Sequence, residues 1–374
     1  MKGLTAIVGA IALIVGVVVG KFLIPSGGEG MQVAETPAAE PSAPAPLAAA
    51  GGDKPVRFKM ASSFPGELVQ LGDQGRRLEQ RIKALSDGNM EFKFYEPGAL
   101  VPALEIFDAV SSGSIDAGWT ASGYWAGKIP ALQFFTAVPF GPYAGETVAW
   151  LFYGGGADLW EELYKPHNIL SMPCNLLAPE GSGWFRNEIN SVEDLKGLKM
   201  RFFGLGAKVM EKLGVSTQLL AGGDIFPALE LGTIDATEYS MPAIDLDLGF
   251  YQVAKHYYFP GWHQPTSVGE LMINLDKWNG MTTHQQEIVR SACKENMLNG
   301  LAQGEAIQFK ALQELQSKGV ILHRWSPEIL DALRTAWGEV VAQEAANDKD
   351  FARVWASLSE FRDGYKLWAE YGNM

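Results

Sequence analysis

Two stretches of this chain repeat one order of secondary structure, and this repeat limits the fold more than any other feature. The hydrophobic pattern of residues 56–120 predicts strand, helix, strand, helix, strand. Residues 198–239 predict the same order. The two units carry similar strings, Gly-Ser-Ile-Asp-Ala at 113–117 and Gly-Thr-Ile-Asp-Ala at 232–236. Two β-α-β-α-β units indicate an α/β protein with two lobes, in which a ligand binds beyond the carboxyl ends of the strands.

After residue 261 the chain is predicted to be largely helical. Thr283 is expected to cap a long helix that ends near Gly319, and residues 320–325 are expected to form a short strand. Ser326 then precedes a proline at the first position of a further helix. These helices are expected to brace the two lobes.

The N-terminus carries an apolar run of a length that spans a bilayer. It covers residues 4–24, is interrupted once by Lys21, and is longer than the apolar core of a typical signal peptide. We expect a retained membrane anchor, with a cleaved signal peptide as the alternative. Positive charge precedes the run and acids follow it, which favours an exported, periplasmic remainder tethered to the inner membrane.

The predicted parts of the chain follow from these patterns. They are a membrane anchor or signal segment (1–24), a Pro/Ala-rich linker (25–54), lobe I (55–177, completed by about 267–325), lobe II (178–266), and C-terminal helices that brace the lobes (326–374).

Composition excludes some classes of function. The formal net charge is -13 and the isoelectric point is near 4.9, which argues against a nucleic-acid partner. The two cysteines, Cys174 and Cys293, are far apart in sequence and form no metal-binding pair. We expect two buried free thiols, with a disulfide as the alternative.

Two enzymatic interpretations of local motifs have to be weighed. Gly204 and Gly206 follow a predicted strand, but Val209 stands at the third glycine position of a dinucleotide fingerprint, so that interpretation fails. Glu180 and Glu238 suggest the carboxylate pair of an extracytoplasmic hydrolase, although sequence spacing does not show that they face each other. His263 is expected to be structural.

Several long motifs resemble one known family of transport proteins. Residues 134–141, 183–214, 219–239 and 256–265 closely resemble the solute-binding proteins of tripartite ATP-independent periplasmic (TRAP) transporters, especially the branch that binds 2-oxo acids and other small monocarboxylates. The resemblance covers essentially everything from residue 55. It implies a two-lobed periplasmic-binding-protein clamshell with a long bracing helix. It also implies delivery of a solute to an ion-driven membrane permease, and no catalysis.

The resemblance also implies roles for individual residues. Arg201 would form a salt bridge with the ligand carboxylate. The Glu238 side chain and the Tyr239 backbone carbonyl would help to ligate a cation that touches the ligand. Glu180 stands where a glutamine is expected, and Gln264 stands where some members carry an acid. This oxygen-rich set suits sodium or calcium and argues against zinc or copper.

Charge gives a physical reason for the cation. Glu180, Glu238 and an anionic ligand would place three negative groups beside one arginine, Arg201, and burial makes that repulsion costly. A carboxylate beside a second oxygen, as in pyruvate or lactate, would bridge the arginine and the cation.

Four aromatic residues near these motifs are candidates for the wall of the ligand site, with packing in the core as the alternative. They are Tyr124, Trp184, Phe203 and Tyr239. The chain stops short of the long C-terminal helix that some relatives exchange in dimers, so we expect a monomer. A module that reports ligand occupancy to a membrane kinase is a further alternative, since the same clamshell would serve it.

Overall fold

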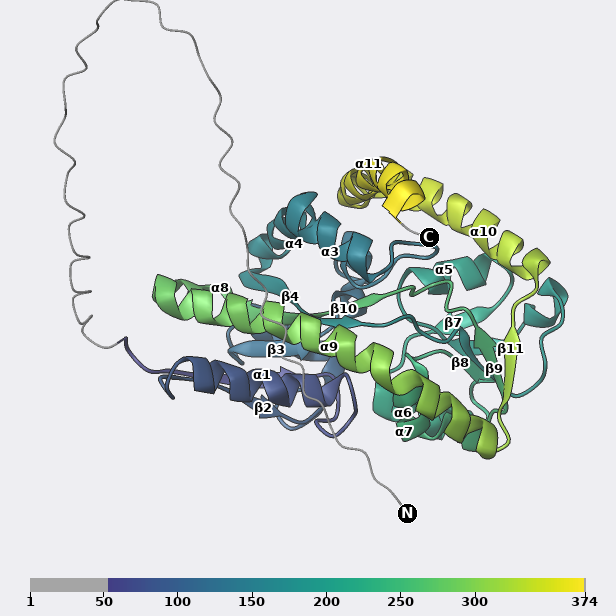
Figure 1. Ribbon diagram of the computed structural model, residues 1–374, viewed down its shortest axis with the longest axis horizontal. Coiled ribbons are helices and arrows are strands. Elements are labelled where there is room, and N and C mark those ends of the chain that lie inside the picture. Colours follow the sequence, from purple (N-terminus) through teal and green to yellow (C-terminus); the bar gives the residue numbers. More distant parts are fainter. Residues whose placement is uncertain (1–52, 373–374) are drawn as a thin grey trace, which may run out of the picture. The chain divides into compact units, whose positions relative to one another are not determined.

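A computed structural model describes residues 53–372 of the chain (Figure 1). The anchor or signal segment and nearly all of the linker therefore lie outside the described residues. The strands are β1 (Val56–Ser62), β2 (Met90–Tyr95), β3 (Ala117–Thr120), β4 (Ile169–Leu177), β5 (Gly183–Phe185), β6 (Lys199–Arg201), β7 (Ser216–Gln218), β8 (Ala236–Thr237), β9 (His256–Phe259), β10 (Ser267–Asn274) and β11 (Ile321–Arg324).

The α-helices lie between and after these strands. They are α1 (Gly72–Leu85), α2 (Ile106–Ser111), α3 (Ala144–Tyr153), α4 (Gly156–Tyr164), α5 (Leu205–Lys212), α6 (Gly222–Glu230), α7 (Pro242–Leu248), α8 (Leu275–Asn279), α9 (Thr283–Ser317), α10 (Pro327–Asn347) and α11 (Lys349–Gly372).

The strands form two mixed sheets, one for each predicted unit. The first sheet has the order β2-β1-β3-β10-β4, and the second has the order β11-β9-β5-β8-β6-β7. In the first, β1 lies between β2 and β3 and is parallel to both. In the second, β6 lies between β7 and β8 and is parallel to both. The expected α/β fold with one β-α-β-α-β unit in each sheet is confirmed.

The repeated Ile-Asp-Ala string has the same structural role in both units. The Asp116 carboxylate accepts a hydrogen bond from the backbone N–H of Lys59 in β1, at 2.8 Å. Asp235 accepts one from the backbone N–H of Lys199 in β6, at 2.9 Å. The glycines that open the two strings have φ angles of 76° and 71°, a conformation that favours glycine. The string therefore fixes the start of the third strand against the central one.

Two short segments carry the chain between the sheets on either side of β5–β9. Residues 178–182 lead from β4 to β5, and residues 260–266 lead from β9 to β10. The backbone N–H of Glu180 donates to the Gln264 carbonyl at 3.2 Å, and the N–H of Gly261 donates to the Glu180 carbonyl at 3.1 Å. The two crossing segments therefore lie side by side.

The long helix α9 contacts elements of both sheets. It packs against β4 and α1, which belong with the first sheet, and against α7, which precedes β9 of the second (Figure 1). The chain leaves α9 beside the second sheet, and β11 pairs there with β9. The assignment of residues 267–325 as a whole to lobe I was therefore wrong for β11.

The start of α9 also differs from the expectation. Thr282, and not Thr283, is the N-cap residue. Its hydroxyl accepts from the backbone N–H of Gln285 at 3.3 Å, and the Gln285 side chain accepts from the Thr282 N–H at 3.0 Å. The side chain of Gln285, three residues on, completes a capping box only with Thr282.

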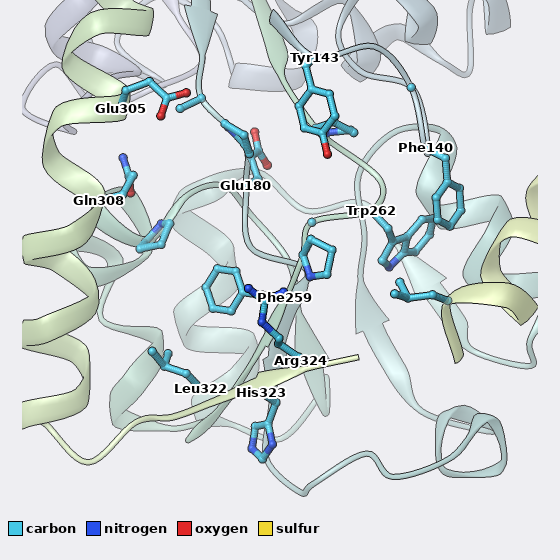
Figure 2. A pocket seen from close by; sticks show the side chains of 18 of the residues that line it. Phe140, Tyr143, Glu180, Phe259, Trp262, Glu305, Gln308, Leu322, His323 and Arg324 are labelled. Carbon is cyan, nitrogen blue, oxygen red and sulfur yellow. The ribbon is translucent and has the colours of Figure 1, made fainter. Parts of the chain in front are cut away.

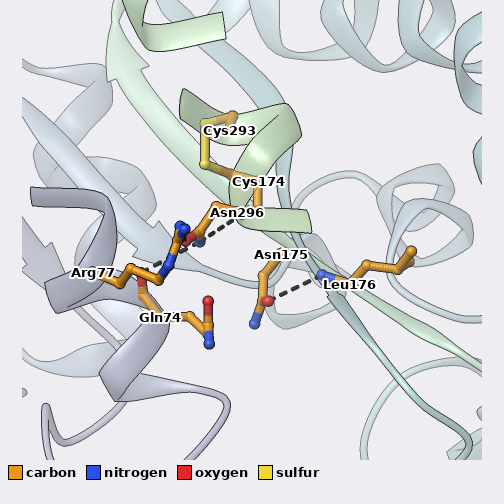
Figure 3. Close-up of a disulfide and its surroundings, with 7 residues drawn as sticks. All are labelled: Gln74, Arg77, Cys174, Asn175, Leu176, Cys293 and Asn296. Atoms are coloured by element: carbon orange, nitrogen blue, oxygen red, sulfur yellow. Dashed lines mark hydrogen bonds between the residues drawn. A yellow bond between two sulfur atoms is a disulfide. The ribbon is translucent and has the colours of Figure 1, made fainter. Parts of the chain in front are cut away.

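Cys174 in β4 and Cys293 in α9 form a disulfide (Figure 3). The expected free thiols were therefore wrong, because the packing of α9 on β4 brings together two residues that are 119 positions apart. Next to the disulfide, the Asn296 side chain donates to the Cys174 carbonyl at 3.0 Å and accepts from Arg77 of α1 at 2.9 Å. This part of α9 is thus fixed to both β4 and α1.

The C-terminal helices contact elements from both halves of the chain. Helix α10 packs against α5, and α11 packs against α3 and α4. Ion pairs join the same elements, Lys208 with Glu344 at 2.5 Å and Arg362 with Glu146 at 3.2 Å. Between residues 53 and 372, no helix is both long enough and apolar enough to cross a bilayer.

Candidate ligand and cation site

A small cavity of about 40 Å³ lies where the carboxyl ends of β3 and β6 meet the crossing segments. Its walls come from both sheets and are mostly aromatic or polar. They include Phe64, Trp119, Tyr124, Thr136, Asn175, Arg201, Phe203, Tyr239, Ser240, Gln264 and Ser267. The cavity therefore lies at the position expected for a ligand site in an α/β protein.

Arg201 is the charged residue on the wall of this cavity. It ends β6, and its side chain is only 1% exposed. Its Nη1 donates to the Glu238 carboxylate at 2.8 Å and to the Glu238 backbone carbonyl at 2.7 Å. Its guanidinium carbon lies 5.2 Å from the centre of the Tyr239 ring and 5.9 Å from that of Phe203. The charge is thus held rigidly between an acid and two aromatic faces.

Glu180 and Gln264 lie on neighbouring crossing segments and contact each other. One carboxylate oxygen of Glu180 accepts from the Gln264 amide at 3.0 Å and from the Ser267 hydroxyl at 2.7 Å. Burial raises the pKa of Glu180 well above its usual value, and the hydrogen bond from Ser267 opposes this shift. The charges of Glu238 and Asp245 raise the pKa further. A cation beside Glu180 would offset the cost of its ionised form.

The polar atoms around this point are buried without hydrogen-bond partners within the described residues. They are Glu180 Oε2, Glu238 Oε2, Gln264 Oε1, the Tyr239 and Ser240 hydroxyls, and both ring nitrogens of His263. Buried polar groups are rarely left unpaired, because each costs the free energy of its lost hydration. These oxygen and nitrogen atoms therefore fit a cation together with a polar ligand.

The predicted aromatic residues divide into two groups. Tyr124, Phe203 and Tyr239 line the cavity. Trp184 does not line it, and its indole N–H donates to Asp245 at 2.8 Å while its ring stacks on Tyr257. Trp184 is therefore a residue of the second sheet's core, and its expected role as a ligand wall was wrong.

A much larger cavity, of about 880 Å³, borders Glu180 but not Arg201 (Figure 2). Its arginines are less suited to hold a small carboxylate. Arg324 and Arg334 are exposed, and Arg362 is paired with Glu146. An anion bound there would stay hydrated, which weakens its attraction to the arginines. The smaller cavity, which has the buried Arg201 on its wall, is therefore the better candidate for a carboxylate site.

Sequence reasoning missed some residues of the site. Ser240 and Ser267 carried no signal, because serines without a motif are common in loops. His263 had a signal, since it precedes Gln264, but a structural role was preferred. The structure brings its side chain to the acids instead, with Nε2 at 3.4 Å from Glu238 Oε2.

Residues 63–348 match the DctP family, the bacterial extracellular solute-binding proteins of family 7. The chain belongs to this family. It is a transport solute-binding protein and not an enzyme, so the hydrolase interpretation of Glu180 and Glu238 is rejected.

Individual relatives cover most of this solute-binding protein. It is 38% identical over 314 residues to a monocarboxylate 2-oxoacid-binding periplasmic protein of a Nostoc species, covering 84% of this chain and 86% of that one. A TRAP solute-binding protein of Bordetella bronchiseptica, with calcium and picolinate, superposes with a TM-score of 0.83 at 35% sequence identity. The match covers 85% of this chain and 95% of that one. A TRAP solute-binding protein of Pseudoalteromonas atlantica, with bound sodium and pyruvate, superposes with a TM-score of 0.82 at 35% sequence identity. The match covers 85% of this chain and 97% of that one.

Proposed function

We propose that this solute-binding protein captures a small monocarboxylate with an oxygen on the adjacent carbon, such as pyruvate or lactate, and delivers it to a TRAP permease. The observation that carries the proposal is the buried cavity with Arg201 on its wall and unpaired acid oxygens beside it. An arginine pairs with a carboxylate through charge-assisted hydrogen bonds, which are stronger than neutral ones.

A bound cation is the second part of the proposal. Glu180, Glu238 and Gln264 would hold it through side-chain oxygens, with the Tyr239 carbonyl completing the set. A metal ion there neutralises the acids and attracts the second oxygen of the ligand. The ligand is then fixed at two points, which favours 2-oxo and 2-hydroxy acids over simple carboxylates.

The relatives support both parts. The Nostoc relative is named for monocarboxylate 2-oxo acids, and the two solved structures hold calcium with picolinate or sodium with pyruvate. Picolinate and pyruvate both carry a second donor atom next to the carboxylate, so each presents the two-point pattern that this cavity requires.

Calorimetry of metal-stripped protein tests the proposal. Pyruvate is titrated in potassium buffer alone and with sodium or calcium added. We expect tight binding only with an added cation, because the ligand and the cation must raise each other's affinity by the same factor. Glu238→Gln should abolish most of this cation dependence.

The matched control is Glu270→Gln, which changes an acid that is also fully buried but lies in β10 and bonds to Trp125, Tyr164 and Ser171. It should bind pyruvate as the wild type does. Equal pyruvate affinity in all three buffers, together with unaltered binding by Glu238→Gln, would refute the cation site.

We also propose that residues 4–24 remain on the mature protein and tether it to the inner membrane. The length of the apolar run and the Pro/Ala-rich spacer behind it support a tether. Intact-mass measurement of protein from its native membrane should find these residues, and a chain that begins near Lys21 would refute the tether.

A further inference from the structure

Ser240 is a buried serine on the wall of the small cavity, and its hydroxyl has no hydrogen-bond partner within the described residues. It lies between β8 and α7 and is 2% exposed. A hydroxyl in this situation has lost its hydration and gained no bond in return, which is costly in a core. A molecule in the cavity that supplies the missing bond would offset this cost.

The other serine and threonine hydroxyls on the cavity wall each have a hydrogen-bond partner at 2.9 Å or less. They are those of Thr120, Thr136 and Ser267. The Tyr239 hydroxyl is also unpaired, but it lies against Gly222 of α6, which is not part of the cavity wall. The hydroxyl of Ser240 is therefore the one on this wall that is left for a ligand.

The backbone of Ser240 is held on both sides, which restricts where its hydroxyl can lie. Its N–H donates to the Asp245 carboxylate at 3.1 Å, and its carbonyl accepts from the N–H of Gly181 at 3.1 Å. Asp245 is itself fixed, since it accepts from the side chains of Trp184 and Tyr257. A hydroxyl on so fixed a backbone loses little freedom when it bonds a ligand.

The size of the cavity brings a ligand held by Arg201 close to Ser240. Both residues line the same cavity of about 40 Å³. A space of that volume holds roughly three water molecules, since each needs about 10 to 15 Å³. A ligand of the size of pyruvate therefore fills this space and contacts its polar wall on more than one side.

We propose that the Ser240 hydroxyl hydrogen-bonds the second oxygen of the ligand, and that it thereby helps the site to prefer 2-oxo and 2-hydroxy acids over simple carboxylates. This inference rests on the proposed function and adds a specificity residue to the same cavity. A serine hydroxyl is both a donor and an acceptor, so it serves the keto oxygen of pyruvate and the hydroxyl of lactate alike. With propionate, which has no second oxygen, the buried hydroxyl stays unpaired, and sites of this kind reject such ligands.

Calorimetry in buffer that contains sodium and calcium compares pyruvate, lactate and propionate on the wild type and on Ser240→Ala. The weaker binding of propionate is measured by competition against pyruvate. We expect the affinities for pyruvate and lactate to fall by about three- to tenfold in Ser240→Ala, which corresponds to the loss of one hydrogen bond. The affinity for propionate should stay as in the wild type, so the preference for pyruvate falls by the same factor.

Ser182→Ala is the matched control for ligand binding. Ser182 is also a buried serine, but it does not line the cavity, and its hydroxyl accepts from the Trp325 indole at 2.7 Å. The Ser182→Ala variant should bind all three acids as the wild type does. Reduced pyruvate affinity in this variant, with none in Ser240→Ala, would overturn the proposal.

Urea unfolding of the ligand-free proteins gives a readout that a merely structural serine would not share. Ser240→Ala should keep or raise the free energy of unfolding, because it removes a buried hydroxyl that has no partner. Ser182→Ala should lower it, since the Trp325 indole loses its acceptor. A loss of stability in Ser240→Ala would show that its hydroxyl has a structural role, and would contradict the inference.

Three binding results would also contradict it. Equal losses for pyruvate and propionate would mean that the Ser240 hydroxyl supports the shape of the site and not the second oxygen. A lower affinity of ligand-free Ser240→Ala for calcium would assign the hydroxyl to the cation instead. Unchanged pyruvate binding would mean that the hydroxyl bonds only a buried water.

The outcome is separable from that of the proposed function. If the wild type does not bind pyruvate, or binds it equally with and without a cation, the proposed function fails whatever Ser240→Ala does. If the wild type needs a cation to bind pyruvate and Ser240→Ala binds it equally well, the carboxylate receptor stands and only this inference fails. Ser240→Gly, which also lacks the hydroxyl, serves as the second variant if Ser240→Ala does not fold.

Discussion

At the scale of residues, Arg201 is held by the main chain as well as by an acid. Its Nη1 bonds the backbone carbonyl and the carboxylate of Glu238, and its Nε lies 3.3 Å from the Leu220 carbonyl. Three acceptors on one guanidinium fix its plane before any ligand arrives. A carboxylate that enters the cavity thus meets a positive group whose orientation requires little further ordering.

We predict that Arg201→Ala weakens pyruvate binding by about 2 to 5 kcal/mol, because it leaves a buried anion unpaired. Arg201→Lys should recover only part of this loss, since an ammonium lacks the planar fork. Calorimetry in the presence of the cation measures both values.

Arg186→Ala is the control for Arg201. Arg186 is half-buried and bonds the backbone carbonyls of Leu229 and Val253, away from the cavity. The Arg186→Ala variant should bind pyruvate with wild-type affinity. Binding by Arg201→Ala within about threefold of wild type, well under 1 kcal/mol, would show that Arg201 only supports Glu238.

The sequence allowed a good part of this site to be predicted, but not the pairing within it. Arg201, Glu238 and Gln264 were found through their place in motifs. That Arg201 pairs with Glu238, or that Trp184 turns away to Asp245, depends on which side chains face each other across the sheet. Such contacts are set by tertiary packing, which spacing along the chain does not encode.

At the scale of elements, the two β-α-β-α-β units place their candidate site residues unequally. β6 carries Arg201 at its end, whereas Ala61 and Ser62 end β1. The hydrophobic pattern sufficed to predict both units, because most of their strands bury at least one face and their helices carry apolar residues on the side that packs on the sheet. The sheet that β11 joins was not predictable, because the sequence of a four-residue strand does not indicate its pairing partner.

The start of α9 gives a prediction at this scale. Thr282→Ala removes the capping hydroxyl and should lower the free energy of unfolding by about 1 kcal/mol. Thr283→Ala changes the neighbouring threonine, which lies inside the helix, and should have almost no effect because alanine is a good helix former. Urea unfolding of the two variants measures the difference, and equal losses would contradict the assigned cap.

At the scale of the whole molecule, two further acids are fully buried outside the proposed cation ligands, Glu270 in β10 and Asp245 in α7. Glu270 accepts hydrogen bonds from Trp125, Tyr164 and Ser171, and burial nevertheless raises its pKa to about 7. Burial likewise raises the pKa of Asp245 to about 7. The folded protein therefore keeps protons that the unfolded chain has already lost above its ordinary carboxyl pKa.

These raised pKa values predict that stability falls as pH rises. For Glu270 the loss runs from its ordinary pKa, 4.5, through about 7, because the folded state binds the proton more tightly than the unfolded state. Between pH 5 and pH 8 the contribution of Glu270 should amount to about 2 to 3 kcal/mol. Glu270→Gln should remove it and flatten the pH dependence of urea unfolding.

The exposed Glu287 provides the control for this prediction. Glu287→Gln should keep the wild-type dependence on pH. If the free energy of unfolding of Glu270→Gln also depends on pH as in the wild type, the Glu270 carboxyl titrates normally in the folded wild-type protein.

The disulfide between Cys174 and Cys293 has a consequence for where the protein matures. Between the two cysteines lie all strands of the second sheet except β11. A disulfide that closes so long a loop stabilises a protein by about 2 to 5 kcal/mol, and it persists only in an oxidising compartment. A copy retained in the cytoplasm would hold its long helix by packing alone. This covalent link between β4 and α9 therefore forms only after the chain has reached an oxidising compartment.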